Sequence, residues 1–224
     1  MLDVGCGTGR TAVPLAGYLD GGTYDGFDVS EPAIRWCQAS LTARYPNFAF
    51  RALDVANTHY NPGGQLDAAR IAFPYEDDAF DFALATSVFT HMLPTGFLNY
   101  ASELSRVLAP GGIFFGTFFL LSESSAASLE RRTAAIDLPT VLADVEAGVR
   151  YRTMTARSPE SVVALPESFV LAGIKGAGLN LTQLRPGHWS GAPNGIIYQD
   201  IVVAQAQPRP RGLGPSAPGP TPAP

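Results

Sequence analysis

The chain has few cysteines and few charges. Only two of its 224 residues are cysteines, Cys6 and Cys37, and their spacing is not that of a metal site. Charged residues make up 16%, and the formal net charge is −5. Nucleic-acid binding generally needs a basic face that neutralises phosphates, and this composition does not provide one overall. We therefore expect a cytoplasmic protein with no resident metal and no nucleic-acid partner.

Long apolar runs are also missing. The longest candidate, "GGIFFGTFFLL", is far shorter than the ~20 residues needed to span a bilayer. No basic region followed by an apolar stretch opens the chain, so no secretory signal is visible. We expect no membrane partner.

What is present is an alternation of strand and helix signals, which is typical of a parallel α/β sheet. Proline and glycine in "APGG" predict the end of a helix before the apolar stretch that follows. The last two strands are close enough in sequence to form an antiparallel pair. The expected strands are 1–4, 21–30, 47–55, 80–89, 113–121, 179–186 and 196–205, and the expected helices are 10–19, 31–45, 97–108 and 166–178.

Three segments do not follow this alternation. Residues 55–79 form a long connection rich in turn residues, and such connections are often functional. Residues 120–160 are mixed polar and helical in pattern, and we expect a cap or substrate-binding insertion there. The remaining residues, 206–224, are rich in proline and glycine and predict a disordered tail. The main domain is thus expected at 1–205.

The first strand leads directly into a glycine loop, "DVGCGTGR", with Gly5, Gly7 and Gly9. Glycines between a strand and a helix let the backbone turn sharply and approach a ligand, and the helix N-terminus favours an anionic group. The spacing differs from the dinucleotide fingerprint G-x-G-x-x-G, whose last position here is Arg10.

Carboxylates follow the next two predicted strands, Asp28 in "GFDVS" and Asp54 in "ALDVA". Neighbouring strands lie about 4.8 Å apart, so these side chains would step away from the glycine loop along one sheet edge. Such a row fits an adenosine, with its ribose at Asp28 and its adenine at Asp54. Asp3, inside the first strand, would be costly to bury unless it were hydrogen-bonded or faced a positive charge.

Together with "FDFALATSVFTHM" and "ELSRVLAPGG", these motifs resemble a class I S-adenosylmethionine-dependent methyltransferase over residues 1–119. The resemblance implies a Rossmann-like three-layer sandwich with a seven-stranded sheet in the order 3-2-1-4-5-7-6, strand seven being antiparallel. It also implies S-adenosyl-L-methionine as cofactor, with the roles that follow. Gly5, Gly7 and Gly9 would line the methionine end, which Asp3 would help to order, Asp28 would hold the ribose, Asp54 and Val55 the adenine, and Ser87 would face the sulfonium.

The implied reaction is an in-line displacement onto an O, N or C atom of an acceptor, and a base is needed only if the acceptor must lose a proton. His91 in "SVFTHM" is the candidate base, while His59, Tyr60, His188 and Trp189 are weaker candidates for the pocket. The Asn/Asp-Pro-Pro-aromatic motif of DNA amino-methyltransferases is absent, so a small-molecule acceptor is the preferred class by elimination.

Two other functions stay open. One is an NAD(P)-dependent oxidoreductase, which Arg10 and the closing antiparallel strands disfavour. The other is a truncated, inactive cofactor-binding or interaction domain. Members of the family have additional residues before strand one, whereas here that strand begins at Met1, so we expect a fragment or an internal start.

Overall fold

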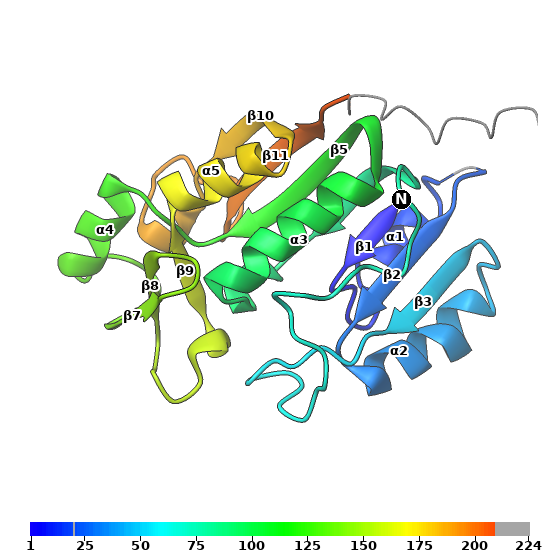
Figure 1. The fold of residues 1–224 in the computed structure, drawn as a ribbon, viewed down its shortest axis with the longest axis horizontal. Coiled ribbons are helices and arrows are strands. Elements are labelled where there is room, and N and C mark those ends of the chain that lie inside the picture. The colour runs from blue at the N-terminus through cyan, green and yellow to red at the C-terminus, as the bar shows by residue number, and fades with distance from the viewer. Residues whose placement is uncertain (20, 209–224) are drawn as a thin grey trace, which may run out of the picture.

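The computed structural model describes residues 1–19 and 21–208, and its centre is a seven-stranded sheet (Figure 1). The strand order is β10-β11-β5-β4-β1-β2-β3. β11 is antiparallel to both of its neighbours, β10 and β5, and the pairs among β5, β4, β1, β2 and β3 are parallel. This confirms the expected Rossmann-like order, β11 being the seventh strand of the family's scheme. The strands are β1 (Leu2–Val4), β2 (Tyr24–Asp28), β3 (Phe48–Ala52), β4 (Phe80–Ala85), β5 (Leu108–Phe118), β10 (Leu179–Arg185) and β11 (Asp200–Ala206).

Helices cover both faces of this sheet. Successive side chains of each strand point to opposite sides, so apolar residues of the same strand pack against helices on either face. Tyr24 packs with residues of α1 (Ala12–Leu15) and α2 (Glu31–Cys37) in one apolar cluster. Phe27, three positions further along β2, belongs to a larger cluster on the other face. That cluster includes α3 (Pro94–Val107) and α5 (Glu167–Gly176). The result is a three-layer sandwich.

The first two helices are shorter than expected. The helix expected at 10–19 is α-helical only at Ala12–Leu15. The one expected at 31–45 is α-helical to Cys37 and then widens into a π-helical turn, Gln38–Thr42. Leu41 in that turn is buried against the cluster of α1 and α2. The widened turn places this side chain in the core on that face of the sheet.

The helix before "APGG" ends at Val107, as the prediction that it stops there requires, but the strand that follows begins at Leu108 and not at the expected residue 113. The structure takes α3 directly into β5, whose first residue Leu108 already pairs with Phe80 of β4. The register of the two strands shifts between Phe80 and Phe82, which accommodates the extra residues. Gly111 has a φ of 86° within this irregular stretch, a conformation that glycine adopts without strain.

The segment 120–160, which was expected to be mixed polar and helical, contributes three strands to a second, four-stranded sheet in the order β6-β9-β8-β7, and β9 follows the segment. Only α4 (Glu123–Glu130) is helical there for more than one turn. This sheet lies toward the side to which the arrowheads of β2, β3 and β5 point (Figure 1). Its strands are β6 (Leu120–Leu121), β7 (Thr140–Asp144), β8 (Val149–Thr153) and β9 (Val163–Pro166).

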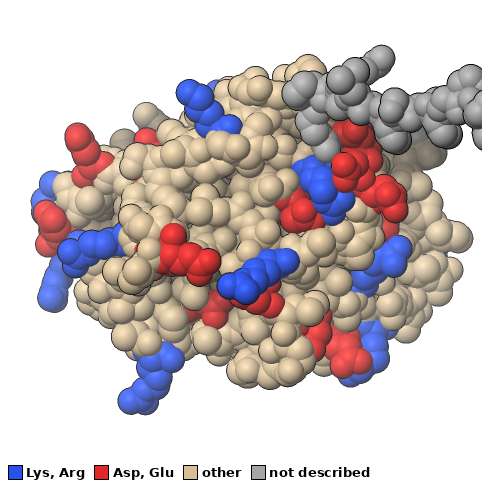
Figure 2. All heavy atoms as spheres, viewed as in Figure 1, with Lys and Arg blue, Asp and Glu red and all other residues tan. Residues whose placement is uncertain are grey.

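On the face seen in Figure 2, acidic and basic side chains are interspersed, and no field of one sign covers it. Within the described residues, no helix has both the length and the apolar character that crossing a membrane requires. Strand β11 ends at Ala206, and the tail predicted for 206–224 lies outside the described residues from position 209 onward.

Candidate functional site

The glycine loop that follows β1 is held in a conformation that other residues rarely adopt. Gly5, Gly7 and Gly9 all have positive φ, at 72°, 53° and 71°. The amides of Gly5 and Cys6 donate to the carbonyl of Phe27 at 2.8 and 3.1 Å, which ties the loop to β2. A Cβ at Gly5 would collide with Val88, whereas a Cβ at Gly7 would meet no protein atom within 4 Å. The bare backbone at Gly7 therefore leaves open space beside the loop.

Asp28 ends β2 and braces this loop. Its Oδ2 accepts from the Gly7 amide at 2.8 Å, and its Oδ1 accepts from the Ser30 amide at 2.8 Å. A carboxylate oxygen offers more than one lone pair, so each oxygen can accept a further hydrogen bond from a ligand hydroxyl.

Asp54 and Val55 follow β3 and differ in how far they are exposed to solvent. Val55 is buried, while Asp54 is exposed and accepts at Oδ1 from Asn61 Nδ2 at 3.0 Å. The Asp54 carbonyl also accepts from the amides of Gln65 and Leu66. These contacts fold the chain after β3 back on itself, so that Asp54 holds this loop in place.

Asp3 is 1% exposed and lies inside the sheet. Its Oδ2 accepts from the Tyr24 hydroxyl at 2.5 Å, and its Oδ1 has no hydrogen-bond partner. Burial raises the pKa of Asp3 to about 7, although the Tyr24 hydrogen bond opposes the shift. The carboxyl group is thus poised between its neutral and charged forms near neutral pH.

Ser87 follows β4 with a φ of 58°, which is uncommon for a residue other than glycine. Its amide donates to Thr117 Oγ1 at 2.8 Å, and its hydroxyl donates to Gln199 Oε1 at 3.0 Å. The strained backbone is therefore held from β5 and from the residue before β11. Such strain is often found at functional sites.

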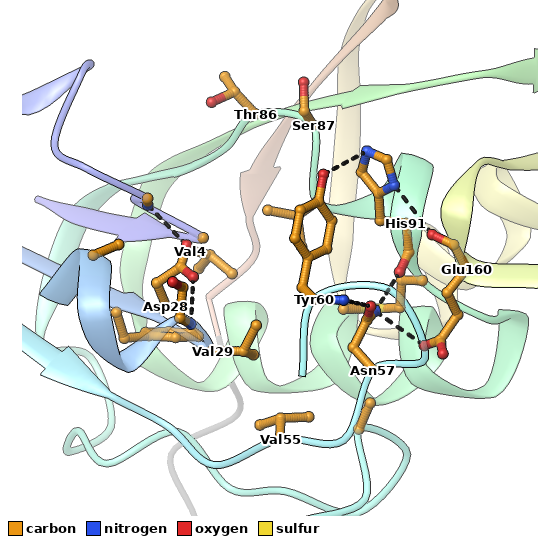
Figure 3. A pocket seen from close by; sticks show the side chains of 18 of the residues that line it. Val4, Asp28, Val29, Val55, Asn57, Tyr60, Thr86, Ser87, His91 and Glu160 are labelled. Carbon is orange, nitrogen blue, oxygen red and sulfur yellow. Dashed lines mark hydrogen bonds between the residues drawn. The ribbon is translucent and has the colours of Figure 1, made fainter. Parts of the chain in front are cut away.

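His91 lies in the short 3₁₀ helix Phe89–His91, opposite Asp28 across the cleft (Figure 3). Its Nδ1 lies 3.1 Å from the backbone carbonyl of Glu160, and its Nε2 lies 3.4 Å from the Tyr60 hydroxyl. The ring of His59 is stacked on that of His91, with centroids 6.0 Å apart. Burial lowers the pKa of His91 from its ordinary value of 6.5, and His59 lowers it further. The imidazole is thus neutral at neutral pH.

Asn57 joins the chain segments around His91. Its Nδ2 donates to the His91 carbonyl at 2.8 Å and to Glu160 Oε1 at 3.1 Å. Its Oδ1 accepts from the amides of His59 and Tyr60 at 3.0 and 2.9 Å. Every donor and acceptor of this amide is thus in use. The other carboxylate oxygen of Glu160 accepts from the Thr58 amide at 2.7 Å.

These groups surround one cleft of about 340 Å³ at the carboxyl ends of β1, β2 and β4. The glycine loop and Asp28 line one side, while Tyr60, His91 and Glu160 line the other (Figure 3). The predicted site residues that line the cleft are Gly5, Gly7, Asp28, Val55, Ser87 and His91. Asp3, Gly9 and Asp54 are not among the lining residues, so any effect of theirs on a ligand must pass through the loops that they support.

Comparison with known proteins narrows what this cleft can be. A family model described as a methyltransferase domain matches residues 2–116. The chain belongs to this methyltransferase family. The resemblance to class I S-adenosylmethionine-dependent methyltransferases that the motifs indicate is thereby confirmed.

Curated relatives of this methyltransferase domain match over about half of the chain. A fatty-acid O-methyltransferase of Mycolicibacterium smegmatis is 31% identical over 117 residues, which are 52% of this chain and 36% of the relative. A phthiotriol/phenolphthiotriol dimycocerosates methyltransferase of Mycobacterium tuberculosis is 30% identical over 114 residues, 51% of this chain and 35% of the relative. The aligned part is thus little more than a third of each relative's length.

Solved structures extend the likeness to the whole fold. A 1,6-didemethyltoxoflavin-N1-methyltransferase of Burkholderia thailandensis, solved with S-adenosylhomocysteine, matches with a TM-score of 0.57 and 16% identity, over 92% of this chain and 70% of that chain. The [4+2]-cyclase SpnF matches equally well, at 0.57 and 19% identity, over 92% of this chain and 74% of that one. Since one fold carries both chemistries, the reaction must be argued from the site.

The methyltransferase cleft also contains residues that the sequence did not single out, Asn57 and Glu160 above all. Asn57 stands in the turn-rich segment 55–79, which was marked as a long connection without a role for each residue. Glu160 comes from the 3₁₀ helix Pro159–Ser161, more than 100 positions away from Asn57 in the chain. Its burial at 7% exposure is the signal, and only the folded structure gives it.

Among the described residues, no three His, Cys, Asp or Glu side chains come together in a way that could hold a metal ion. Of the four weaker candidates, Tyr60 lines the cleft and His59 does not. The other two, His188 and Trp189, lie in another 3₁₀ helix, His188–Ser190, and do not line it either. Trp189 is fully buried, and its indole N–H donates to Asp200. Its contacts are those of a core residue.

Proposed function

We propose that this chain transfers a methyl group from S-adenosylmethionine to a small-molecule acceptor. The observation that carries the proposal is a single cleft with an open-backbone glycine loop and Asp28 on one side and a neutral histidine on the other. When bound, S-adenosylmethionine supplies a methyl group already activated on a sulfonium sulfur. The protein then has to align the acceptor and exclude water, and alignment alone can contribute on the order of 7–11 kcal/mol.

The residues present fit this cofactor. The space beside Gly7, where a Cβ would meet nothing, accommodates its amino-acid end, which Gly5 also borders. Asp28 has lone pairs left for ribose hydroxyls, and Val55 offers a buried apolar surface for the adenine. Asp54 supports that surface through the loop contact with Asn61, and Ser87, which lines the cleft, would face the sulfonium.

Two predicted residues act from behind the cleft. Gly9 lets the loop pack close to α2 and the π-helical turn, since a Cβ there would collide with Leu41. Asp3 anchors the strand that carries the loop through Tyr24, and would in this way help to order the methionine end.

His91 serves as the base when the acceptor must lose a proton. Its imidazole is neutral at neutral pH and borders the cleft opposite Asp28. A positioned base of this kind contributes typically 10²–10⁴-fold to a rate.

The relatives' names give the acceptor class some support. They include a fatty acid and phthiotriol compounds, which are small molecules. We carry over only the class, a small-molecule acceptor, with nucleic acid and membrane not expected as partners. Segment 120–160 contributes Glu160 to the cleft wall, which supports a role as cap. Two free, buried cysteines are consistent with the cytoplasmic compartment that we propose.

Isothermal titration calorimetry tests the proposal. S-adenosylmethionine and S-adenosylhomocysteine should each bind one site, and NAD⁺ should not bind. Binding of NAD⁺ alone would favour an oxidoreductase. A heat of binding for none of the three ligands would favour an inactive or interaction domain. Product formation over a panel of acceptors then identifies the substrate.

A further inference from the structure

Tyr60 stands inside the cleft, with its ring between Asp28 and His91 (Figure 3). Its hydroxyl lies 3.4 Å from His91 Nε2. The residue is 53% exposed, so the folded chain does not use it as a core side chain. A large aromatic ring that is left open in a cleft offers its surface to the ligand that the cleft binds.

Backbone and ring contacts hold Tyr60 in place. Its amide donates to Asn57 Oδ1 at 2.9 Å, and the backbones of Asn57 and Asn61 exchange two hydrogen bonds of 3.0 Å, which close the turn that carries the ring. The rings of His59 and His91 meet that of Tyr60 at nearly right angles, with centroids 4.6 and 5.1 Å away. The ring is therefore preorganised, which reduces the cost of ordering it when a ligand binds.

The polar side chains around this ring already have hydrogen-bond partners within the protein. The Ser87 hydroxyl donates to Gln199, and the two carboxylate oxygens of Glu160 accept from Asn57 Nδ2 and from the next backbone amide. Tyr60 adds a different kind of group to the lining. The face of an aromatic ring is negative, and it attracts a cation that has no hydrogen-bond donor to offer.

The electrostatic potential at the ring favours a positive charge. Burial raises the pKa of Tyr60 above its ordinary value of 10.0, and the Asp28 carboxylate raises it further. The phenol is thus uncharged at neutral pH, and the negative potential of Asp28 extends to it. Among the described residues that line the cleft, the cationic side chain is Arg10, which belongs to the glycine loop. A cation between Asp28 and Tyr60 therefore meets a carboxylate on one side and a neutral aromatic ring on the other.

We propose that the Tyr60 ring binds the positive charge of the sulfonium and so favours S-adenosylmethionine over S-adenosylhomocysteine, which lacks that charge. The inference rests on the proposed methyl transfer and adds a cofactor-binding residue to its site. With the ribose at Asp28 and the acceptor on the side of His91, the sulfur belongs between them, where Tyr60 stands. A sulfonium carries no N–H or O–H group, so it is recognised by its charge, as quaternary ammonium groups are by aromatic side chains.

Calorimetry of the intact chain with both ligands tests this inference. The quantity compared is the Kd of S-adenosylhomocysteine divided by that of S-adenosylmethionine, because a loss of packing common to both ligands cancels in the ratio. Tyr60→Leu keeps an apolar side chain without a π surface, and it should lower the ratio about 5- to 30-fold relative to wild type. Tyr60→Phe keeps the ring and loses the hydroxyl, and its ratio should stay within about twofold of wild type.

Tyr18→Leu is the matched control, because Tyr18 is 80% exposed and does not line the cleft. It should keep the ratio of wild type, and urea unfolding should show that all three variants are folded. An unchanged ratio in Tyr60→Leu would overturn the inference, and so would a ratio in Tyr60→Phe or Tyr18→Leu as low as that in Tyr60→Leu. A wild-type chain that binds neither ligand would refute the proposed function itself, and the inference with it.

Discussion

Asp3 is a carboxyl group in an otherwise apolar strand, and its protonation links this one residue to the stability of the protein. Burial raises its pKa from 3.8 to about 7 in the folded state. Between these two pH values the folded chain holds a proton that the unfolded chain has lost. The free energy of unfolding therefore falls as the pH rises from about 4 to about 7 on account of this group.

Asp3→Asn should remove this dependence, because the amide oxygen still accepts from Tyr24 and carries no charge. Between about pH 5 and about pH 8, wild type should lose roughly 2–3 kcal/mol of unfolding free energy more than the variant. Urea unfolding at the two pH values measures the difference. Parallel losses in both proteins would mean that Asp3 titrates near its ordinary pKa.

Asp28 joins the loop and the proposed ribose site, so its removal should affect binding in particular. Asp28→Ala should weaken S-adenosylhomocysteine binding by about 1–3 kcal/mol, the usual range for hydrogen bonds to a charged group. Asp81→Asn, exposed at the opposite end of β4, is the matched control and should bind as wild type does. If calorimetry gave the same affinity for wild type, Asp28→Ala and Asp81→Asn, the ribose would not bind at Asp28.

At the scale of elements, two glycines of the same loop serve different purposes, Gly9 for packing and Gly7 for ligand binding. A Cβ at Gly9 would collide with Leu41, while one at Gly7 would enter the cleft. Both substitutions incur the cost of a positive φ, about 1–2 kcal/mol. Gly9→Ala should lower the unfolding free energy by a further 1–3 kcal/mol or so, from overpacking.

Gly7→Ala should instead weaken S-adenosylhomocysteine binding at least about tenfold, equivalent to ~1.4 kcal/mol, because its methyl group takes space proposed for the ligand. Urea unfolding and calorimetry on both variants give the comparison. If Gly9→Ala proved no less stable than Gly7→Ala, the packing argument would fail.

Asp200 connects β11 to the second sheet and is a second test at this scale. Its carboxylate accepts from the amides of Gly187 and Leu120 and from Trp189 Nε1, each at 2.7 Å. Asp200→Asn would turn an N–H₂ group toward one of these donors and leave it unsatisfied. We expect a loss of about 1–3 kcal/mol in unfolding free energy, with Asp81→Asn again unchanged. A fully stable Asp200→Asn protein would contradict this role.

The strands that surround the cleft could be predicted for two reasons. Their apolar patterns lie within short stretches of sequence, and their motifs resemble those of class I methyltransferases. "GFDVS" and "ALDVA" each end an apolar run with an acid, and both stretches end strands of the sheet. The start of β5 could not be predicted, because Pro and Gly in "APGG" end helices in general, and only the pairing of Leu108 with Phe80 shows that the strand has begun. The strands of the second sheet were not predicted, because apolar and polar residues alternate only weakly within them. Their partners in the sheet lie beyond turns and loops of the chain, so no local pattern marks the pairing.

For the whole molecule, the sequence named lining residues on both sides of the cleft, Gly5, Gly7 and Asp28 on one and His91 and Tyr60 on the other, but it missed Asn57 and Glu160. Gly5, Gly7 and Asp28 follow strand ends that the chain order already brings together. Asn57 and Glu160 meet only because segment 120–160 returns to the edge of the main sheet, which no local pattern reveals.

Binding of a cofactor to the folded state alone should stabilise the whole chain. At a free S-adenosylhomocysteine concentration of 100 times Kd, the unfolding free energy should rise by about 2.7 kcal/mol. Thermal unfolding with and without the ligand measures this shift, and Asp28→Ala at the same ligand concentration should gain less. No shift in wild type would mean that the folded chain does not bind the ligand.

The central claim is that one nucleoside lies across the carboxyl ends of β1 and β2, with its sugar at Asp28. A crystal structure of the chain grown with S-adenosylhomocysteine tests this most directly. We predict ribose hydroxyls within hydrogen-bond distance of the Asp28 carboxylate and the amino-acid end beside Gly5 and Gly7. A ligand bound elsewhere, or an Asp28 carboxylate that does not touch it, would contradict the claim.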